Sequence, residues 1–190
     1  IPHTFPEPHP IAAKARDARV EIICDIELLA RSQRLSNYIG ITGTNGKSTT
    51  TALTAHILQQ AGISVTVGGN LGISMAALNS PGETGVRVVE LSSYQLEITP
   101  SLAPDIAVIL NISPDHIERH GTLENYIAAK ALAIGNVKAG GLVALGKSAL
   151  LQSIRPTDKN CRLQIIDPNT APASTAHNPA LIGNHNKQNA

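Results

Sequence analysis

The sequence contains little charge and very few aromatic residues. Charged side chains make up 15% and aromatic ones 2% of its 190 residues, and the formal net charge is +1. Proteins that bind nucleic acid usually carry clustered positive charge, and many stack bases on aromatic rings. Because the composition offers neither feature, we expect no nucleic-acid partner.

Cysteines and long apolar runs are also scarce. The two cysteines, Cys24 and Cys161, have neither CxxC nor metal-site spacing, so they do not indicate a disulfide framework. No apolar run approaches the roughly 20 residues of a membrane-spanning helix, and the first residues do not resemble a secretory leader. We expect a protein of the reducing cytoplasm without a membrane partner, and we expect it to be a monomer.

The most informative stretch that is present is YIGITGTNGKSTTT, residues 38–51. An apolar run at 38–41 predicts a buried strand, and a helical pattern follows from about 48 to 61. A glycine loop with lysine and a hydroxyl between strand and helix is typical of a phosphate-binding loop. Glycines let backbone N–H groups turn toward an anion, and the helix N-terminus adds partial positive charge. An ordinary strand-to-helix turn is the alternative.

The predicted phosphate contacts involve every residue of this loop. Lys47 can reach the terminal phosphates, and the hydroxyl of Ser48 can face a magnesium ion. One departure from the general pattern is Ile41, which stands where that pattern has glycine. The predicted nucleotide-binding residues of the loop are Gly43, Thr44, Asn45, Gly46, Lys47, Ser48 and Thr49.

Apolar runs and helical patterns alternate along the rest of the chain. Such alternation predicts an α/β fold, a mostly parallel sheet with helices on both faces, here of the P-loop type that binds nucleotides. Pro10 is suited to open the first helix, Thr122 to cap the fifth, and Leu28 and Leu29 should both face inward. The expected strands are 20–23, 38–41, 65–67, 86–89, 106–110, 142–145 and 163–166. The expected helices are 11–18, 26–33, 48–61, 73–78, 123–137 and 148–154.

Polar residues follow four of the expected strands, at 42–49, 68–72, 90–95 and 111–116. In a parallel α/β sheet, ligands bind at the carboxyl ends of the strands. Because these ends lie at the same edge of the sheet, we expect the four segments to form one site.

Three side chains could carry chemistry, two of them at these strand ends. Glu90 is placed to hold a magnesium ion that bridges phosphates, although a surface acid at a strand end is the alternative. His116 could be a metal ligand or an acid–base group, whereas His120 is expected to be structural. Lys130 lies in an apolar segment; physical reasoning favours a side chain that extends to solvent, with a desolvated lysine of lowered pKa as the alternative.

Six motifs, taken together, resemble the Mur ligase family. They are TGTNGKST, VGGNLG, VELSSYQLE, LNISPDHIERHG, YIAAKALAI and GNHNKQNA, and they cover most of residues 37–190 in the order of that family. VELSSYQLE and GGNLG resemble the branch that adds D-glutamate to UDP-N-acetylmuramoyl-L-alanine. The resemblance implies an ATP-driven ligase that activates the substrate carboxylate as an acyl phosphate, which the amine of D-glutamate then attacks.

The resemblance also implies a role for particular residues, with ATP and Mg²⁺ as cofactors. It implies that Lys130 is carbamylated, which would turn a cation into an anion suited to a second magnesium ion. The implied catalytic residues are Lys47, His116 and Lys130; the implied metal ligands are Ser48, Glu90, His116 and Lys130; those near the UDP-muramoyl substrate are Asn70, Ser92, Gln95 and His116; and those near the ATP base are Asn186 and Asn189.

The ends of the chain suggest part of a longer protein, because it starts at Ile1 and its only methionine is Met75. We expect residues 1–36 to be the tail of an N-terminal UDP-substrate domain with its linker. Residues 37–190 would be a truncated central ATP-binding domain, without the C-terminal domain and with little activity alone. Alternatives are a sister Mur ligase, a folylpolyglutamate synthetase-like ligase, or a P-loop module without ligase chemistry. The guanine signature Asn-Lys-x-Asp is missing from the sequence, which argues against a GTPase.

Overall fold

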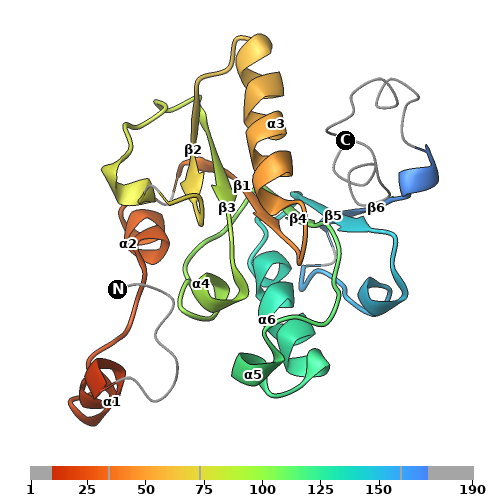
Figure 1. The fold of residues 1–190 in the computed structure, drawn as a ribbon. Helices are drawn as coiled ribbons and strands as arrows, with labels where there is room; N and C mark the ends of the chain where they lie inside the picture. Colours follow the sequence, from red (N-terminus) through yellow and green to blue (C-terminus); the bar gives the residue numbers. More distant parts are fainter. Residues whose placement is uncertain (1–9, 34, 73, 159, 171–190) are drawn as a thin grey trace.

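A parallel sheet forms the centre of the molecule in the computed structural model, which describes residues 10–33, 35–72, 74–158 and 160–170 (Figure 1). Within these residues the sheet has six strands in the order β2-β3-β1-β4-β5-β6. All five strand pairings are parallel. The strands are β1 Asn37–Thr42, β2 Val65–Gly69, β3 Val86–Glu90, β4 Ile106–Ile109, β5 Leu142–Gly146 and β6 Arg162–Ile166. The predicted α/β fold with a parallel sheet is confirmed.

Helices cover both faces of the sheet, as predicted. The α-helices are α1 Pro10–Asp17, α2 Asp25–Ser32, α3 Lys47–Gln60, α4 Ser93–Glu97, α5 Ile117–His120 and α6 Leu123–Gly135, and short 3₁₀ turns are η1 Met75–Ala77, η2 Ala149–Leu151 and η3 Pro168–Thr170. Successive residues of a strand point to opposite faces. Val88 therefore packs with α3 residue Ala55, whereas Val89 packs with Leu29 of α2 and Leu96 of α4. Helices α4, α5 and α6 lie together on the side away from α3 (Figure 1).

Two local predictions were wrong. Residues 20–23 form no strand in the described structure, and Val20 is 60% exposed. A β-branched run does not become a strand unless a sheet edge is within reach of its backbone. Leu28 is 55% exposed although Leu29 is buried. The buried face of α2 carries Ile26, Glu27, Leu29 and Ala30, and Leu28, about 100° from Leu29 around the axis, lies outside it.

Some helix boundaries also differ from the prediction. The expected helices at 73–78 and 148–154 are single 3₁₀ turns, and α4 and α5 were not predicted. Thr122 caps α6 as predicted, since its hydroxyl accepts a hydrogen bond from the Asn125 amide at 3.2 Å. No helix in the described part of the chain is long and apolar enough to cross a membrane.

Candidate functional site

The loop between β1 and α3 is held against the segment that follows β4. The Thr44 amide donates to the Asn111 carbonyl at 3.0 Å, and the Asn45 amide donates to Asn111 Oδ1 at 2.9 Å. A Cβ on Gly43 would lie 3.3 Å from the Asn111 nitrogen, so a glycine allows this close approach. Gly46, with φ of 82°, turns the chain into α3. Contacts within the chain therefore hold the loop in position.

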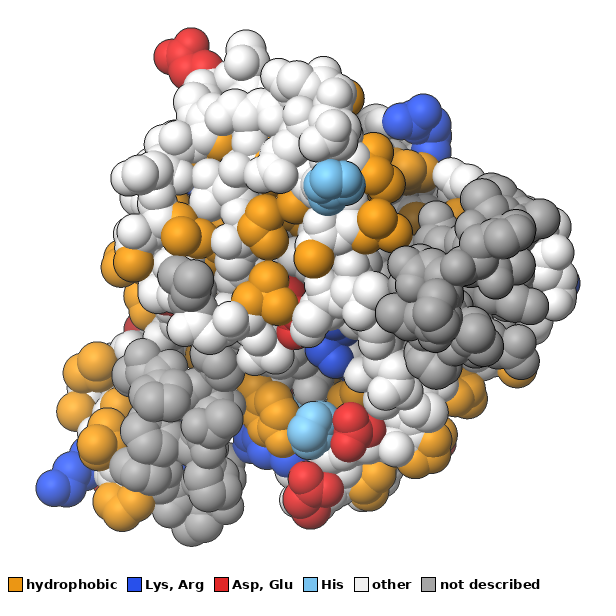
Figure 2. All heavy atoms as spheres, turned by 45° about the horizontal axis from the view of Figure 1, so that its top comes forward, with side chains coloured by type: hydrophobic (Ala, Val, Ile, Leu, Met, Phe, Trp, Pro, Cys, Tyr) orange, Lys and Arg blue, Asp and Glu red, His pale blue; other side chains and the backbone are white. Residues whose placement is uncertain are grey.

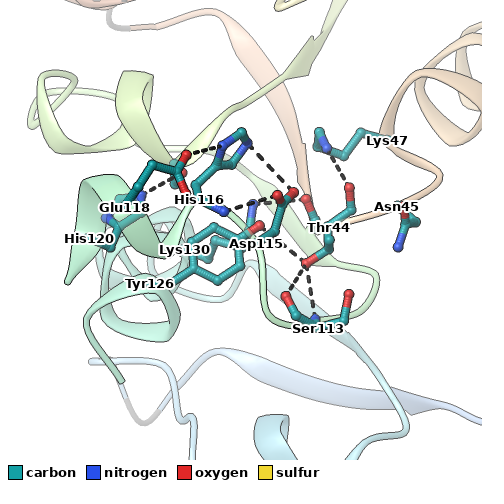
Figure 3. A network of polar contacts seen from close by, with 12 residues as sticks. Thr44, Asn45, Lys47, Ser113, Asp115, His116, Glu118, His120, Tyr126 and Lys130 are labelled. Carbon is teal, nitrogen blue, oxygen red and sulfur yellow. Dashed lines mark hydrogen bonds and ion pairs between the residues drawn. The ribbon is translucent and has the colours of Figure 1, made fainter. Parts of the chain in front are cut away.

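Thr44 and Lys47 extend this network (Figure 3). The Ser113 amide donates to Thr44 Oγ1 at 3.1 Å, and the Tyr126 hydroxyl lies 3.2 Å from the same oxygen. Lys47 folds back so that its Nζ donates to the Thr44 carbonyl at 2.8 Å. Ser48, in the first turn of α3, is exposed to solvent. The lysine and the serine hydroxyl therefore flank the same open helix N-terminus.

Glu90, the last residue of β3, is buried with an exposure of 1%. Its Oε1 accepts a hydrogen bond from Asn70 Nδ2 at 3.0 Å. Its Oε2 is buried and has no hydrogen-bond partner among the described residues. A buried carboxylate oxygen without a partner costs stability, so a ligand at this position would satisfy it.

Lys130, in α6, does not extend to solvent, which corrects the expectation drawn from physical reasoning alone. It is 2% exposed, and its Nζ donates to the Gly43 carbonyl at 2.8 Å. Burial, reinforced by the charge of Lys47, lowers the pKa of Lys130 to about 7. The face of α6 that bears Lys130 packs toward β1, so the ammonium finds a backbone acceptor inside the fold rather than water.

The two histidines have different surroundings. His116 precedes α5 in a left-handed conformation, its side chain is 43% exposed, and its Nε2 lies 3.6 Å from Asp115 Oδ2. His120 is buried, and its Nε2 lies 3.0 Å from Ser93 Oγ. Burial lowers the pKa of His120, partly offset by the charge of Glu97. His116 is therefore the histidine that a ligand at the carboxyl edge can reach.

Ser92 and Gln95 form a capping box at the start of α4. The Gln95 amide donates to Ser92 Oγ at 3.2 Å, and the Ser92 amide donates to Gln95 Oε1 at 3.0 Å. Gln95 Nε2 is buried without a hydrogen-bond partner in the described part of the chain. It is the second orphaned polar atom beside a strand end, after Glu90 Oε2.

Apart from Lys130 on α6, the predicted site residues that the structure describes thus lie at or after the carboxyl ends of four strands. Those strands are β1, β2, β3 and β4, which are adjacent in the sheet. Acidic, basic and histidine side chains gather in and beside a hollow on the face shown in Figure 2. Asn186 and Asn189 lie outside the described residues.

Residues 41–166 match the Mur ligase middle domain. The chain belongs to the Mur ligase family. Relatives called UDP-N-acetylmuramoylalanine–D-glutamate ligase include one from Rhodospirillum rubrum, 57% identical over 130 residues, which make up 68% of this chain and 27% of that protein. Another, from Rhodopseudomonas palustris, is 47% identical over 150 residues, covering 77% and 32% of the two chains. This chain therefore spans about a third of the length of these relatives.

Solved structures of Mur ligases have the same fold. The UDP-N-acetylmuramate:L-alanyl-γ-D-glutamyl-meso-diaminopimelate ligase of Neisseria meningitidis superposes with a TM-score of 0.66 at 19% identity, covering 98% of this chain and 68% of that one. MurF from Thermotoga maritima, solved in complex with ADP, gives 0.60 at 22% identity, covering 75% and 36%. At these identities the likeness concerns the fold alone.

Sequence reasoning missed one residue that shapes this Mur ligase site. In the sequence, Asn111 is only one of the polar residues that follow a strand, yet its side chain accepts from the Asn45 amide and donates to the Asn45 carbonyl at 3.0 Å. Its position directly after an apolar strand indicates that Asn111 lies at the carboxyl edge of the sheet. The partner could not be read from the sequence, because the two residues are 66 positions apart.

Proposed function

We propose that this chain is the nucleotide-binding core of an ATP-dependent ligase that joins D-glutamate to UDP-N-acetylmuramoyl-L-alanine, a step of peptidoglycan synthesis. Relatives called UDP-N-acetylmuramoylalanine–D-glutamate ligase are 45–57% identical to the chain. The structural observation that carries the proposal is the orphaned Oε2 of Glu90 on the strand next to the phosphate loop. An activated-phosphate reaction needs both a phosphate cradle and a metal-binding carboxylate.

The loop 43–49 would hold the phosphates of ATP. Backbone amides at the start of α3 and the glycines of the loop provide donors and partial positive charge. Lys47 now donates to the Thr44 carbonyl, and it would exchange this acceptor for a phosphate oxygen. Its charge would offset the repulsion between an anionic carboxylate and an anionic triphosphate.

The residues present fit a magnesium ion that arrives with the nucleotide. The described part of the chain contains no group of three or more His, Cys, Asp or Glu that could hold a metal. Mg²⁺ commonly takes only one or two carboxylates and completes its shell with phosphate oxygens and water. Glu90 through Oε2, Ser48 and His116 are the proposed ligands. The ion would supply positive charge to the reacting phosphate.

Lys130 is the residue that we propose becomes a carbamate. With its pKa lowered to about 7, a large fraction of the side chain is an uncharged amine at neutral pH. Such an amine can attack CO₂, forming a C–N bond and releasing a proton to water. The resulting carbamate still has one N–H for the Gly43 carbonyl, and its two oxygens would face a second magnesium ion.

The remaining groups would position the acceptor. We propose that Asn70, Ser92, Gln95 and His116 contact the UDP-muramoyl substrate, so that its carboxylate attacks the γ-phosphate. An acyl phosphate and ADP form; the amine of D-glutamate then attacks the acyl carbon, and phosphate leaves. Positioning and charge stabilisation would account for most of the acceleration.

The division of the chain follows from the same proposal. Residues 1–36 would end the domain that holds the UDP portion, and residues 37–190 would belong to the central ATP-binding domain. D-Glutamate contacts would come from the C-terminal domain. We expect the 190-residue chain alone to show little or no turnover; activity near that of the full-length enzyme would contradict this division.

The test is phosphate release by the full-length enzyme with ATP and Mg²⁺. Release should require both UDP-N-acetylmuramoyl-L-alanine and D-glutamate, and L-glutamate or diaminopimelate should not replace D-glutamate. Preference for another amino acid or acceptor would identify a sister ligase instead. Hydrolysis that is independent of any carboxylate acceptor would support a nucleotide-binding module without ligase chemistry.

A further inference from the structure

Helix α2 makes two polar contacts with the segment that follows β2. Asp25 Oδ2 accepts a hydrogen bond from Ser74 Oγ at 2.7 Å and another from the Met75 amide at 2.9 Å. Asp25 and Ser74 are 49 positions apart in the sequence, and neither was a predicted site residue. We propose that Asp25 is a positioning residue of the ligase: it fixes the loop that carries Asn70, and Asn70 in turn orients Glu90. This inference rests on the proposed function.

The near end of that loop is attached to Glu90. The Asn70 amide donates to the Glu90 carbonyl at 3.0 Å, while its side-chain nitrogen donates to Glu90 Oε1 at 3.0 Å. Gly69, with φ of +100°, permits this contact, because a Cβ there would lie 2.2 Å from the Glu90 oxygen. With Oε1 engaged by Asn70, the carboxylate has a defined rotation and presents Oε2 as the free ligand.

The loop itself has little burial to hold it. Asn70, Leu71 and Gly72 are all exposed, so packing cannot define their position. Their order must come from the attachments at the two ends. At the far end, Met75 is fully buried in the same core cluster as Ile26 of α2, and Asp25 bonds the amide of that methionine.

Glu27, two residues further along α2, provides a contrast. It is fully buried; its carboxylate accepts from the Ser101 amide at 2.9 Å and from Arg31 Nε at 2.6 Å. Ser101 lies beyond α4, away from the strand end that bears Glu90. Both acids anchor α2 to a loop, but only the Asp25 loop leads to a proposed metal ligand. Glu27 therefore serves as the control for a purely structural anchor.

Loosening the loop should act on the metal site. If Asn70 no longer holds Oε1, Glu90 samples other rotations and binds Mg²⁺ less well. Loss of residues that orient metal ligands typically weakens metal affinity by about 10- to 100-fold. Asp25 acts on Glu90 only through Asn70, so we expect an effect at the lower end of this range. The half-saturating Mg²⁺ concentration should rise by about tenfold.

The experiment compares Asp25→Ala, Asp25→Asn and Glu27→Gln in the full-length enzyme by two measurements. The first is the Mg²⁺ dependence of phosphate release, and the second is amide hydrogen exchange of residues 70–75 without Mg²⁺ or nucleotide. We expect Asp25→Ala to raise both the Mg²⁺ requirement and the exchange rates. Asp25→Asn should restore both, since an amide oxygen can accept the same two hydrogen bonds. Glu27→Gln should lower the melting temperature without changing the Mg²⁺ requirement.

Each contrary result overturns a defined part of the proposal. Faster exchange in Asp25→Ala with an unchanged Mg²⁺ requirement would make Asp25 a structural anchor only. Unchanged exchange would show that Asp25 does not hold the loop. If the wild-type enzyme itself shows no acceptor-dependent phosphate release, the proposed function fails, while hydrogen exchange still decides whether the loop depends on Asp25.

Discussion

Two lysines near the same helix have opposite surroundings. Lys130, in α6, is buried and bonded to a backbone carbonyl of the phosphate loop. Lys138, three residues beyond the end of that helix, pairs with Asp105 Oδ2 at 2.9 Å and also donates to the Ser36 carbonyl at 2.9 Å. The partner of Lys138 carries the opposite charge, whereas the partner of Lys130 is neutral.

The positions of these lysines in the sheet explain the difference. Asp105 and Ser36 directly precede β4 and β1, so Lys138 lies at the amino edge of the sheet, where it is paired with Asp105. Lys130 lies at the carboxyl edge, together with the orphaned atoms of Glu90 and Gln95. Unsatisfied buried groups cost stability, and ionisable groups with shifted pKa values concentrate at functional sites. We therefore expect the amino edge to stabilise the fold and, under the proposed function, the carboxyl edge to bind ligands.

The largest effect should come from Lys130→Met in the full-length enzyme. If the carbamate supports a magnesium ion, turnover should fall by about 10²–10³-fold, the usual range for losing a group that stabilises developing charge. Lys138→Met should leave the turnover number unchanged. Phosphate-release assays would measure both, and short carboxylates added to Lys130→Met should restore part of the activity. Unaltered turnover in Lys130→Met would rule out an essential role for Lys130.

Glu90→Gln should have the next largest effect. Glutamine keeps an oxygen for the Asn70 side chain but removes the charge, so it separates metal binding from loop structure. We expect the half-saturating Mg²⁺ concentration to rise by about 100-fold. Hydrogen exchange of residues 70–75 should stay as in the wild type. A normal Mg²⁺ titration in the variant would remove Glu90 from the proposed metal ligands.

Much of the fold could be predicted because most strands of the sheet are short apolar runs. The pattern works for β1 and β3, whose buried residues face cores on both sides. It fails at 20–23, where the same residue types find no neighbouring strand. It also missed α4, although Ser92 and Gln95 have the spacing of a capping box. Local patterns report what a segment favours, whereas pairing depends on distant parts of the chain.

The sequence could predict which strand ends form the site, but not which residues the site side chains contact. Glu90 and Lys47 could be picked out because their residue types follow strands in a recognisable loop pattern. Neither the contact of Asp25 with Ser74 nor the burial of Lys130 has a local signature in the sequence. Both arise when helices that are remote in the chain pack against the sheet. For Lys130 the resemblance pointed to the interior, and physical reasoning on the segment alone did not.

The pH dependence of stability should distinguish the two lysines further. The pKa of Lys130 falls from 10.5 to about 7 on folding, so between those values the unfolded chain holds a proton that the folded one lacks. Stability therefore rises with pH across this window, by up to about 1.4 kcal/mol per pH unit from this group. Below pH 7 Lys130 is protonated in both the folded and the unfolded chain. The stability gained at higher pH is then fully lost, because the folded protein must bury the ammonium group.

Denaturant unfolding at pH 6, 8 and 10, in buffers free of CO₂, would measure this slope. Lys130→Met should be more stable than the wild type at pH 6, and the gap should shrink as the pH rises to 10. Lys138→Met supplies the control, because it leaves Lys130 in place and so should keep the wild-type slope. Parallel curves for the wild type and Lys130→Met would mean that Lys130 keeps its proton when the protein folds.

The smallest effect should come from Lys138→Met itself. Its ion pair with Asp105 is partly exposed, and such pairs contribute about 0–1 kcal/mol. Asp105 would not be left alone, because its Oδ2 also accepts from the Tyr38 amide at 2.8 Å. Asp105→Asn keeps that acceptor, so a double-mutant cycle of Lys138→Met and Asp105→Asn, read by denaturant unfolding, isolates the charge interaction. A coupling of several kcal/mol, or a loss of turnover in Lys138→Met, would show that the amino edge does more than stabilise the fold.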